Sequence, residues 1–288
     1  MIPEPLTAHL PDGPLSVALV RSIDDRLRAA NPPPAPTTRP AVVTTAGVQL
    51  RVHGGGEACV LWIHGGGMFL GAAEYEDAFC CDLADQLGAA VVAVDYRLAP
   101  EHPHPAPLDD CRAALAWCAE RYRRVVVAGR SAGGGLAAAL CLLNRDQNGP
   151  HIAAAHLWYP MLDDRHETPS ARELADAPVW NRRLSELAWA AYLGGEPADR
   201  YAAPARATDL AGLPPTYLDC GDRDLFRDET ADYARRLEAQ GVQTRRFEIE
   251  GGVHAFELFD PAAAISVQTE ARRLEALRRS LGEDFRTW

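Results

Sequence analysis

The sequence Arg124-Val125-Val126-Val127-Ala128-Gly129-Arg130-Ser131-Ala132-Gly133 joins two different patterns within ten residues. The valine run is typical of a buried strand, and residues 132–144 are rich in Ala and Leu, which favours a helix directly behind it. Gly129 to Gly133 therefore form a G-x-S-x-G motif between a strand and a helix, where a sharp turn projects the Ser131 hydroxyl outward as a nucleophile. The helix N-terminus behind it would favour negative charge at the reacting centre. The alternative is a glycine-rich turn whose serine only caps the helix.

The rest of the chain alternates short apolar runs with segments of helical periodicity. Continuous apolar strands that alternate with helices are typical of a mostly parallel sheet with helices on both faces, so the sequence predicts an α/β fold. The expected strands are residues 48–52, 59–63, 90–94, 124–128, 153–158, 216–220 and 244–249, and the expected helices are residues 75–87, 108–122, 132–144, 229–240 and 262–281.

Two segments are expected to lie outside this alternation. An amphipathic segment precedes the proline-rich run at residues 31–36, which cannot lie inside a helix. Further along, residues 163–207 carry apolar residues at helical spacing together with several prolines. We expect both segments to pack over one edge of the sheet and to shape substrate access. The predicted division is an N-terminal cap segment at 1–40, an α/β core at 41–162 and 208–288, and a helical cap insertion at 163–207.

A second glycine-rich motif, His64-Gly65-Gly66-Gly67, directly follows the expected strand at residues 59–63. Consecutive glycines expose backbone N–H groups without side chains in the way, as an oxyanion hole requires. A flexible glycine turn is the alternative interpretation. It does not explain why the motif directly follows a buried strand and precedes a G-x-S-x-G motif. We expect His64 to hold the loop and to take no part in proton transfer.

A serine nucleophile needs a base to take its proton and an acid to orient that base. In an α/β-hydrolase both partners follow the serine, in the order Ser, Asp, His. Of four downstream histidines, only His254 lies in a loop after the last expected strand. The acid is expected just beyond the strand at residues 216–220, where Asp222, Asp224 and Asp228 compete. Asp228 is better placed to cap the helix that follows, which leaves the other two aspartates open.

The chain resembles the hormone-sensitive-lipase-like esterases, the bacterial family IV esterases of the α/β-hydrolase fold superfamily. The resemblance implies an α/β-hydrolase fold with a helical cap. It assigns Asp224 as the acid and Gly66, Gly67 and Ala132 as oxyanion donors, and it makes a homodimer plausible. It covers residues 64–256 and rests on the motifs His64-Gly65-Gly66-Gly67, Asp95-Tyr96-Arg97-Leu98-Ala99-Pro100-Glu101-His102-Pro103-His104-Pro105-Ala106, Ser131-Ala132-Gly133-Gly134, Asp224-Leu225-Phe226-Arg227-Asp228-Glu229 and His254-Ala255-Phe256.

Two features need separate interpretation. Arg130 stands where the family usually has an acidic residue. Because arginine keeps its charge at any working pH, we expect either a carboxylate beside it or an exposed guanidinium. His102 and His104 lie near Glu101 in a proline-rich segment, which indicates a rigid structural loop and not a metal site. No metal and no cofactor are expected.

The motifs together predict a serine hydrolase that cleaves carboxylic esters of short-to-medium acyl chains through an acyl-enzyme intermediate. Ser131, His254 and Asp224 are the predicted catalytic residues. The same residues could cleave amides or lactones, and a small-molecule binding protein or a lyase on the same scaffold are alternatives from other classes. The predicted substrate pocket is apolar and consists of Met68, Phe69, Trp180, Trp189, Tyr192, Leu225 and Phe256.

Composition excludes several other functions. All 29 basic residues are arginine, so enzymes that need a lysine amine, including pyridoxal phosphate enzymes and Walker-type NTPases, are excluded. A net charge of -11 without a basic stripe argues against a nucleic acid or an anionic membrane as partner. Seven cysteines without CxxC spacing, and an N-terminus without signal-peptide features, predict free thiols and a cytoplasmic location.

Overall fold

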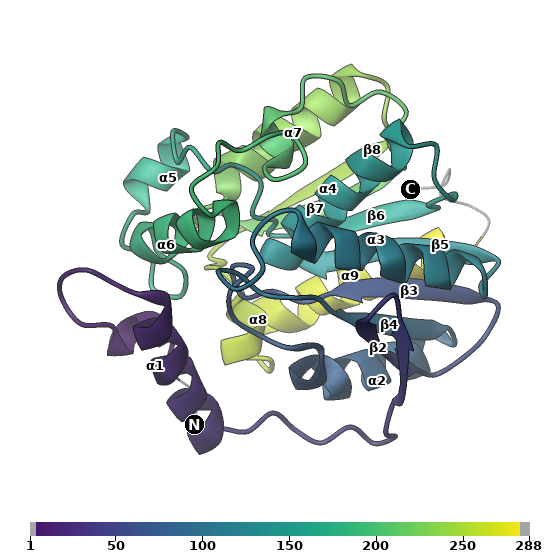
Figure 1. Ribbon diagram of the computed structural model, residues 1–288, viewed down its shortest axis with the longest axis horizontal. Helices are drawn as coiled ribbons and strands as arrows, with labels where there is room; N and C mark the ends of the chain where they lie inside the picture. The colour runs from purple at the N-terminus through teal and green to yellow at the C-terminus, as the bar shows by residue number, and fades with distance from the viewer. Residues whose placement is uncertain (1–3, 283–288) are drawn as a thin grey trace.

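The computed structural model describes residues 4–282, which form an eight-stranded sheet flanked by helices (Figure 1). The strand order is β1-β2-β4-β3-β5-β6-β7-β8. β2 runs antiparallel to both of its neighbours, and every other pairing is parallel, which confirms the predicted mostly parallel sheet. The strands are β1 (Ala41–Thr45), β2 (Val48–His53), β3 (Ala58–Ile63), β4 (Ala90–Asp95), β5 (Arg124–Arg130), β6 (Ala154–Trp158), β7 (Thr216–Gly221) and β8 (Thr244–Ile249).

The central strands are buried almost throughout, because helices cover both faces of the sheet. α2 (Asp77–Leu87) and α9 (Ala264–Leu281) pack together on one face, and α3 (Ala106–Ala119) and α4 (Ala132–Asp146) pack together on the other. α7 (Arg227–Ala239) packs against β7 and β8. All seven cysteines are buried and free, as the sequence predicts.

The register of the sheet brings the sequence motifs together. Ile63, the last residue of β3, pairs with Gly129 of β5, and Arg130 pairs with Trp158 at the end of β6. The loops that follow parallel neighbouring strands emerge at the same edge of the sheet. The glycine-rich loop after β3, the turn after β5 and the residues after β6 therefore meet at this edge.

The segments at residues 4–40 and 163–207 contain helices but no strand within the described residues. α1 (Val17–Ala30) begins after Ser16, whose hydroxyl accepts a hydrogen bond from the Leu19 N–H, and α6 (Arg182–Leu193) begins after Asn181, whose side chain accepts from the Leu184 N–H. Figure 1 shows α1, α5 and α6 near one another at one end of the sheet, with α8 beside them. The remaining short elements are η1 (Leu6–His9), η2 (Ala73–Glu76), α5 (Pro169–Glu173), η3 (Pro204–Arg206) and α8 (Phe256–Phe259).

No helix within residues 4–282 has the length and apolar character that crossing a bilayer requires.

Candidate active site

Ser131 occupies a strained turn between β5 and α4, with φ 54° and ψ -122°. A positive φ is uncommon for a residue with a side chain and occurs where the surroundings enforce it. The enforcing contacts are backbone contacts at glycine. A Cβ on Gly129 would lie 2.4 Å from the Gly133 carbonyl oxygen, and one on Gly133 would lie 2.1 Å from the Ile63 carbonyl oxygen. Only glycine fits at either position, so these two residues permit the sharp turn.

Ser131, His254 and Asp224 form one continuous line of hydrogen bonds. The Ser131 Oγ lies 2.9 Å from His254 Nε2, and His254 Nδ1 lies 2.7 Å from Asp224 Oδ2. The second carboxylate oxygen of Asp224 accepts the Phe226 N–H at 2.9 Å, which fixes the orientation of the carboxylate. All three side chains are buried, Asp224 completely. A serine is thus in contact with a base, and that base is oriented by an acid, as nucleophilic catalysis requires.

The two neighbouring aspartates make other contacts. Asp222 accepts the Gly251 N–H at 2.8 Å, so it holds the loop before His254. Asp228 was expected to cap the helix, and that expectation is wrong. The helix begins at Arg227, one residue before Asp228, and the Asp228 carboxylate accepts the Ser170 N–H at 2.7 Å. Asp228 therefore fastens the start of α5 to α7.

Three aromatic rings surround the His254 imidazole. Tyr159 and Phe226 pack edge-on against it, with ring centroids 4.9 Å and 5.2 Å away, and Trp180 lies 6.2 Å away. The Tyr159 hydroxyl donates to Glu257 Oε1 at 2.5 Å. Sequence reasoning missed Tyr159 and Phe226. The available signal for Tyr159 was its position directly after β6, at the carboxyl edge of the sheet.

The glycine-rich loop after β3 lies against the serine turn. Gly66 and Gly67 have φ angles of 114° and 60°, and a Cβ on Gly66 would lie 2.2 Å from the Leu70 carbonyl oxygen. Within residues 4–282, no hydrogen bond takes the N–H of Gly66 or Gly67. Ala132 follows Ser131 at the first turn of α4, where helix N–H groups have no intrahelical acceptor. The predicted donors Gly66 and Gly67 thus lie on the loop that packs against the serine turn, and Ala132 lies at the start of α4, directly after Ser131.

His64 is held inside the same loop. Its ring stacks on Tyr96 at 4.1 Å, and the Tyr96 hydroxyl donates to the His64 carbonyl oxygen at 3.0 Å. Burial lowers the pKa of His64, which keeps the ring neutral. These contacts agree with the expectation that His64 supports the loop.

A cavity of about 380 Å³ opens beside the Ser131 hydroxyl, and we call it the site cavity. Of the seven predicted pocket residues, the structure places only Trp180 in its lining. The other six are buried outside it, namely Met68, Phe69, Trp189, Tyr192, Leu225 and Phe256. The lining consists of Leu6, Arg28, Asn31, Pro33, Gly65, Gly66, Leu70, Gly71, Ala72, Tyr75, Glu76, Arg130, Ser131, Tyr159, Val179, Trp180, His254, Ala255, Leu258 and Phe259.

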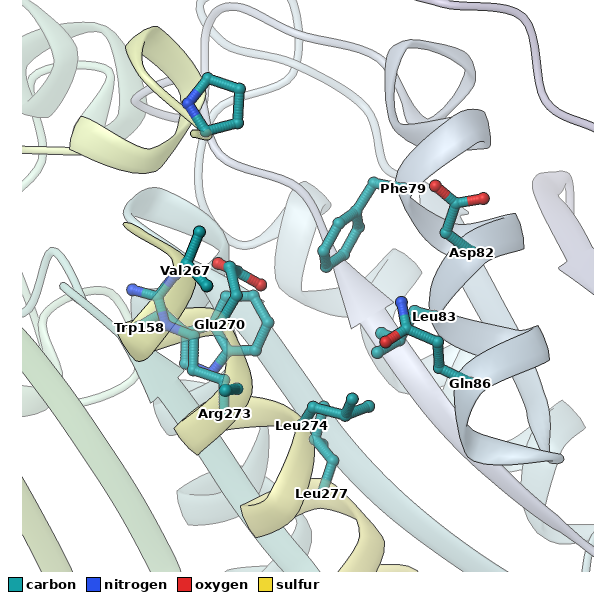
Figure 2. Close-up of a pocket in the computed structure, with 12 residues that line it drawn as sticks. Phe79, Asp82, Leu83, Gln86, Trp158, Val267, Glu270, Arg273, Leu274 and Leu277 are labelled. Carbon is teal, nitrogen blue, oxygen red and sulfur yellow. Dashed lines mark hydrogen bonds and ion pairs between the residues drawn. The ribbon is translucent and has the colours of Figure 1, made fainter. Parts of the chain in front are cut away.

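A second cavity, of about 420 Å³, lies between α2 and α9 (Figure 2). Figure 2 shows Trp158, Glu270 and Arg273 on one side of it and Phe79 on the other. Its lining contains none of Ser131, His254 and Asp224. The slightly larger volume therefore does not make it the better candidate site, because the reactive geometry belongs to the smaller cavity.

Arg130 forms a buried ion pair with Glu76. Its guanidinium also lies 5.9 Å from the Trp62 ring and 5.4 Å from the Phe79 ring. Burial alone would lower the pKa of Arg130, but the Glu76 carboxylate outweighs it and the pKa is raised. Of the two arrangements expected for this arginine, the structure shows the one with a carboxylate beside it.

The proline-rich segment packs against α6. His104 Nδ1 lies 3.2 Å from the Tyr192 hydroxyl, and its Nε2 lies 3.6 Å from Asp199. Within residues 4–282 no three His, Cys, Asp or Glu side chains are grouped as a metal site would need.

A buried Ser–His–Asp line at the carboxyl edge of a mostly parallel sheet, with a glycine-rich loop beside it, defines the class of α/β-hydrolases. A family model described as an alpha/beta hydrolase fold matches residues 60–258. The chain belongs to this family, and the resemblance to hormone-sensitive-lipase-like esterases is confirmed.

Individual relatives agree with this assignment. Carboxylesterase NlhH of Mycobacterium tuberculosis is 37% identical over 235 residues, which cover 77% of this chain and 73% of the relative. Esterase LipI of the same organism is 38% identical over 232 residues, covering 76% and 72% of the two chains. Among solved structures, the bacterial heroin esterase superposes with a TM-score of 0.87 at 37% identity, over 96% of this chain and 97% of that one.

Proposed function

We propose that the protein is a carboxylesterase that cleaves esters of short-to-medium acyl chains through an acyl-enzyme intermediate on Ser131. The observation that carries the proposal is the hydrogen-bonded line Ser131–His254–Asp224, of which Ser131 and His254 line the site cavity. Membership of a family whose similar relatives are carboxylesterases and esterases supports the ester-hydrolase activity.

In the proposed reaction, His254 Nε2 takes the Ser131 proton as the hydroxyl attacks the acyl carbon. The N–H groups of Gly66, Gly67 and Ala132 stabilise the oxyanion, and the positive end of α4 favours the same charge. His254 then gives the proton to the leaving alcohol. A water molecule, activated by the same imidazole, releases the acid from Ser131 and completes the turnover. Asp224 holds the imidazole in the tautomer that each step needs.

The proposed acyl-chain range rests on the site cavity. A volume of about 380 Å³ lies near the lower end of the range for ligand pockets, roughly 300–1,000 Å³. Trp180 forms part of its lining. The six other predicted pocket residues, which are buried outside the lining, are proposed to shape the cavity by packing against the residues that line it: Met68, Phe69, Trp189, Tyr192, Leu225 and Phe256.

The experiment uses p-nitrophenyl butyrate and compares the wild type with Ser131→Ala. We expect a pre-steady-state burst of p-nitrophenol from the wild type and none from the variant. A reactive phosphonate should add one label to the wild type and none to Ser131→Ala in intact-mass measurements. Anilide and lactone analogues test the amide and lactone alternatives. Binding of esters without turnover and without labelling would instead support a binding protein.

We further propose a cytoplasmic homodimer. Seven buried free thiols suit a reducing compartment, and β8 is at one end of the strand order that residues 4–282 form, a position from which sheets of two copies can associate. Light scattering coupled to size-exclusion chromatography measures the mass in solution, and a monomer at micromolar concentration would contradict the dimer.

A further inference from the structure

The lining of the site cavity combines two chemically different groups of residues. The apolar group, which we call the apolar wall, includes Leu6, Val179, Trp180, Leu258 and Phe259. The polar group, which we call the polar wall, consists of Arg28, Asn31, Tyr75, Glu76 and Arg130. An apolar pocket for simple alkyl esters does not need two guanidinium groups and a carboxylate in its lining, because burying charge is costly.

The polar wall begins directly at the nucleophile. Arg130 precedes Ser131 in the chain, and Gly65 covers both residues. A Cβ built on Gly65 would lie 3.4 Å from the Ser131 Cβ and 3.7 Å from the Arg130 Cγ. Part of a substrate bound at Ser131 is therefore in reach of this wall.

Arg130 has more donors than its partner uses. A guanidinium carries five N–H donors, and within residues 4–282 its only hydrogen bond joins Nη2 to Glu76 Oε2. The Trp62 indole N–H donates to the same oxygen at 3.3 Å. The Arg130 nitrogens that make no hydrogen bond are not fully enclosed by protein atoms, so each of them is accessible to a small partner. Arg130 belongs to the lining of the site cavity, and its side chain is 10% exposed.

A second guanidinium stands at the same wall. Arg28 lies 4.5 Å over the Tyr75 ring, and its Nε bonds Asp24 at 2.7 Å. Asp24 is outside the cavity lining, so the lining itself holds two guanidinium groups and one carboxylate. Both guanidinium groups are paired with a carboxylate, and both keep N–H donors that these partners do not use.

We propose that the polar wall is a substrate subsite for esters that carry a second oxygen acceptor, a keto or carboxylate oxygen, a few bonds from the scissile carbonyl. This inference rests on the proposed ester hydrolysis and names the substrate class for it. The acceptor takes the spare N–H groups of Arg130, with Glu76 keeping that guanidinium in place. The rest of the substrate contacts the apolar wall.

The test compares three ethyl esters of nearly equal size by pH-stat: ethyl levulinate, monoethyl succinate and ethyl pentanoate. They differ at the far end of the acyl chain, which carries a keto group, a carboxylate or only alkyl carbon. We expect kcat/KM for at least one acceptor ester to exceed that for ethyl pentanoate by about tenfold, as for a hydrogen bond to a charged group. A higher kcat/KM for ethyl levulinate would identify the preferred acceptor as a neutral keto oxygen, and a higher value for monoethyl succinate would identify it as a carboxylate.

The matched variant is Glu76→Met/Arg130→Met, which removes both charges together and leaves neither one buried alone. The preference should fall to roughly one in this variant. The control is Arg51→Met/Asp77→Met, another ion pair beside α2 that lies outside the cavity lining. It should keep the wild-type preference.

If the double variant does not fold, product inhibition of the wild type provides the second measurement. Levulinate or succinate should then inhibit about tenfold more strongly than pentanoate. Equal rates for all three esters, or a preference that survives Glu76→Met/Arg130→Met, would overturn the subsite while ester hydrolysis stands. Failure to hydrolyse any ester, with no phosphonate label on Ser131, would overturn the proposed function and the subsite with it.

Discussion

Asp224 is distinguished from Asp222 and Asp228 by its contact with His254, and this difference can be measured. Asp224→Asn should lower kcat by about 10⁴, because an amide stabilises the wrong imidazole tautomer. Asp222→Asn removes only a bond to the Gly251 N–H and should have a far smaller effect. Kinetics with a p-nitrophenyl ester compare the two variants. A severe loss in Asp222→Asn with a mild one in Asp224→Asn would mean that the acid is two residues earlier.

His156 is a buried histidine that the proposed reaction does not use. It lies on β6, stacks on Tyr217 at 5.3 Å and bonds the Ser280 hydroxyl at 2.8 Å. Burial lowers the pKa of His156 to about 3, well below the value near 6.5 of the unfolded chain. The unfolded state therefore binds a proton that the folded state excludes, and this part of the stability decreases as the pH falls from about 6.5 towards 3.

We expect His156→Phe to make unfolding less sensitive to acid. Each unit of pKa difference corresponds to about 1.4 kcal/mol. The free energy of unfolding should therefore fall less steeply with decreasing pH in the variant than in the wild type, as measured by urea unfolding at pH 8, 6 and 5. His151→Gln, at an exposed position, is the control. Parallel pH dependences for wild type and His156→Phe would contradict the argument.

At the level of residues, those that belong to a sequence motif could be predicted, and those that only tertiary contacts bring to the site could not. Ser131 follows from a local pattern, because its turn needs glycines at fixed spacing, and His254 follows from its position in the loop after the last strand. Spacing could not separate Asp222 from Asp224, and the family resemblance was needed. Residues of the cavity lining such as Arg28 and Tyr159 come from separate segments, so periodicity within one segment could not find them.

At the scale of elements, one arginine connects α1 with two loops of the core, beside the buried Val20 and Ile23 of the same helix. Arg21 donates to the Phe69 carbonyl oxygen at 3.0 Å and to the Ala99 carbonyl oxygen at 2.7 Å, and it pairs with Glu101 at 2.6 Å. α1 carries Arg28, which lines the site cavity. The contacts of Arg21 therefore hold one wall of the cavity over the loop that contains Phe69.

Arg21→Met should loosen this wall, so we expect KM to rise several-fold while kcat changes little. Arg26→Met is the matched control, since Arg26 is exposed and, among the residues that the structure describes, bonds only the Ser22 carbonyl oxygen of its own helix. Steady-state kinetics on p-nitrophenyl butyrate give both constants. A fall in kcat at constant KM would show that Arg21 supports the glycine-rich loop and not the wall.

Most strands and helices were predicted close to their observed bounds, including the largely exposed strand β8 and the end of α9. β1 was missed because its five residues are mostly exposed and lack the apolar run of a buried strand. α8 was missed because four residues are too few to show helical periodicity.

At the scale of the whole molecule, one buried arginine connects the segments that carry the acid and the base. Arg273 of α9 binds both oxygens of Asp219 at 2.8 Å and contacts Glu257 at 3.1 Å. Asp219 lies on β7, shortly before Asp224, and Glu257 lies on α8, shortly after His254. Burial alone would raise the pKa of Glu257, but Arg273 and the Tyr159 hydroxyl outweigh it, so the pKa is lowered and the carboxylate stays charged.

The surface and the cavity together predict which esters the protein prefers. Four large hydrophobic side chains are exposed within residues 4–282, and they lie on four different elements: Leu19, Val42, Leu258 and Val267. Single exposed side chains do not form the broad apolar patch that binding to a lipid surface would use. The site cavity, at about 380 Å³, is also small for a long acyl chain.

We therefore expect kcat/KM for p-nitrophenyl esters to be highest for short-to-medium acyl chains, in the range of roughly two to eight carbons, and to fall for palmitate, because a long chain cannot be enclosed. Tributyrin hydrolysis, followed across its solubility limit, provides the second measurement. The rate should follow the dissolved substrate and level off, since the described surface offers no patch for the emulsion interface. A sharp increase in rate above the solubility limit, or rapid cleavage of emulsified triolein, would show interfacial activation and contradict this reading of the surface.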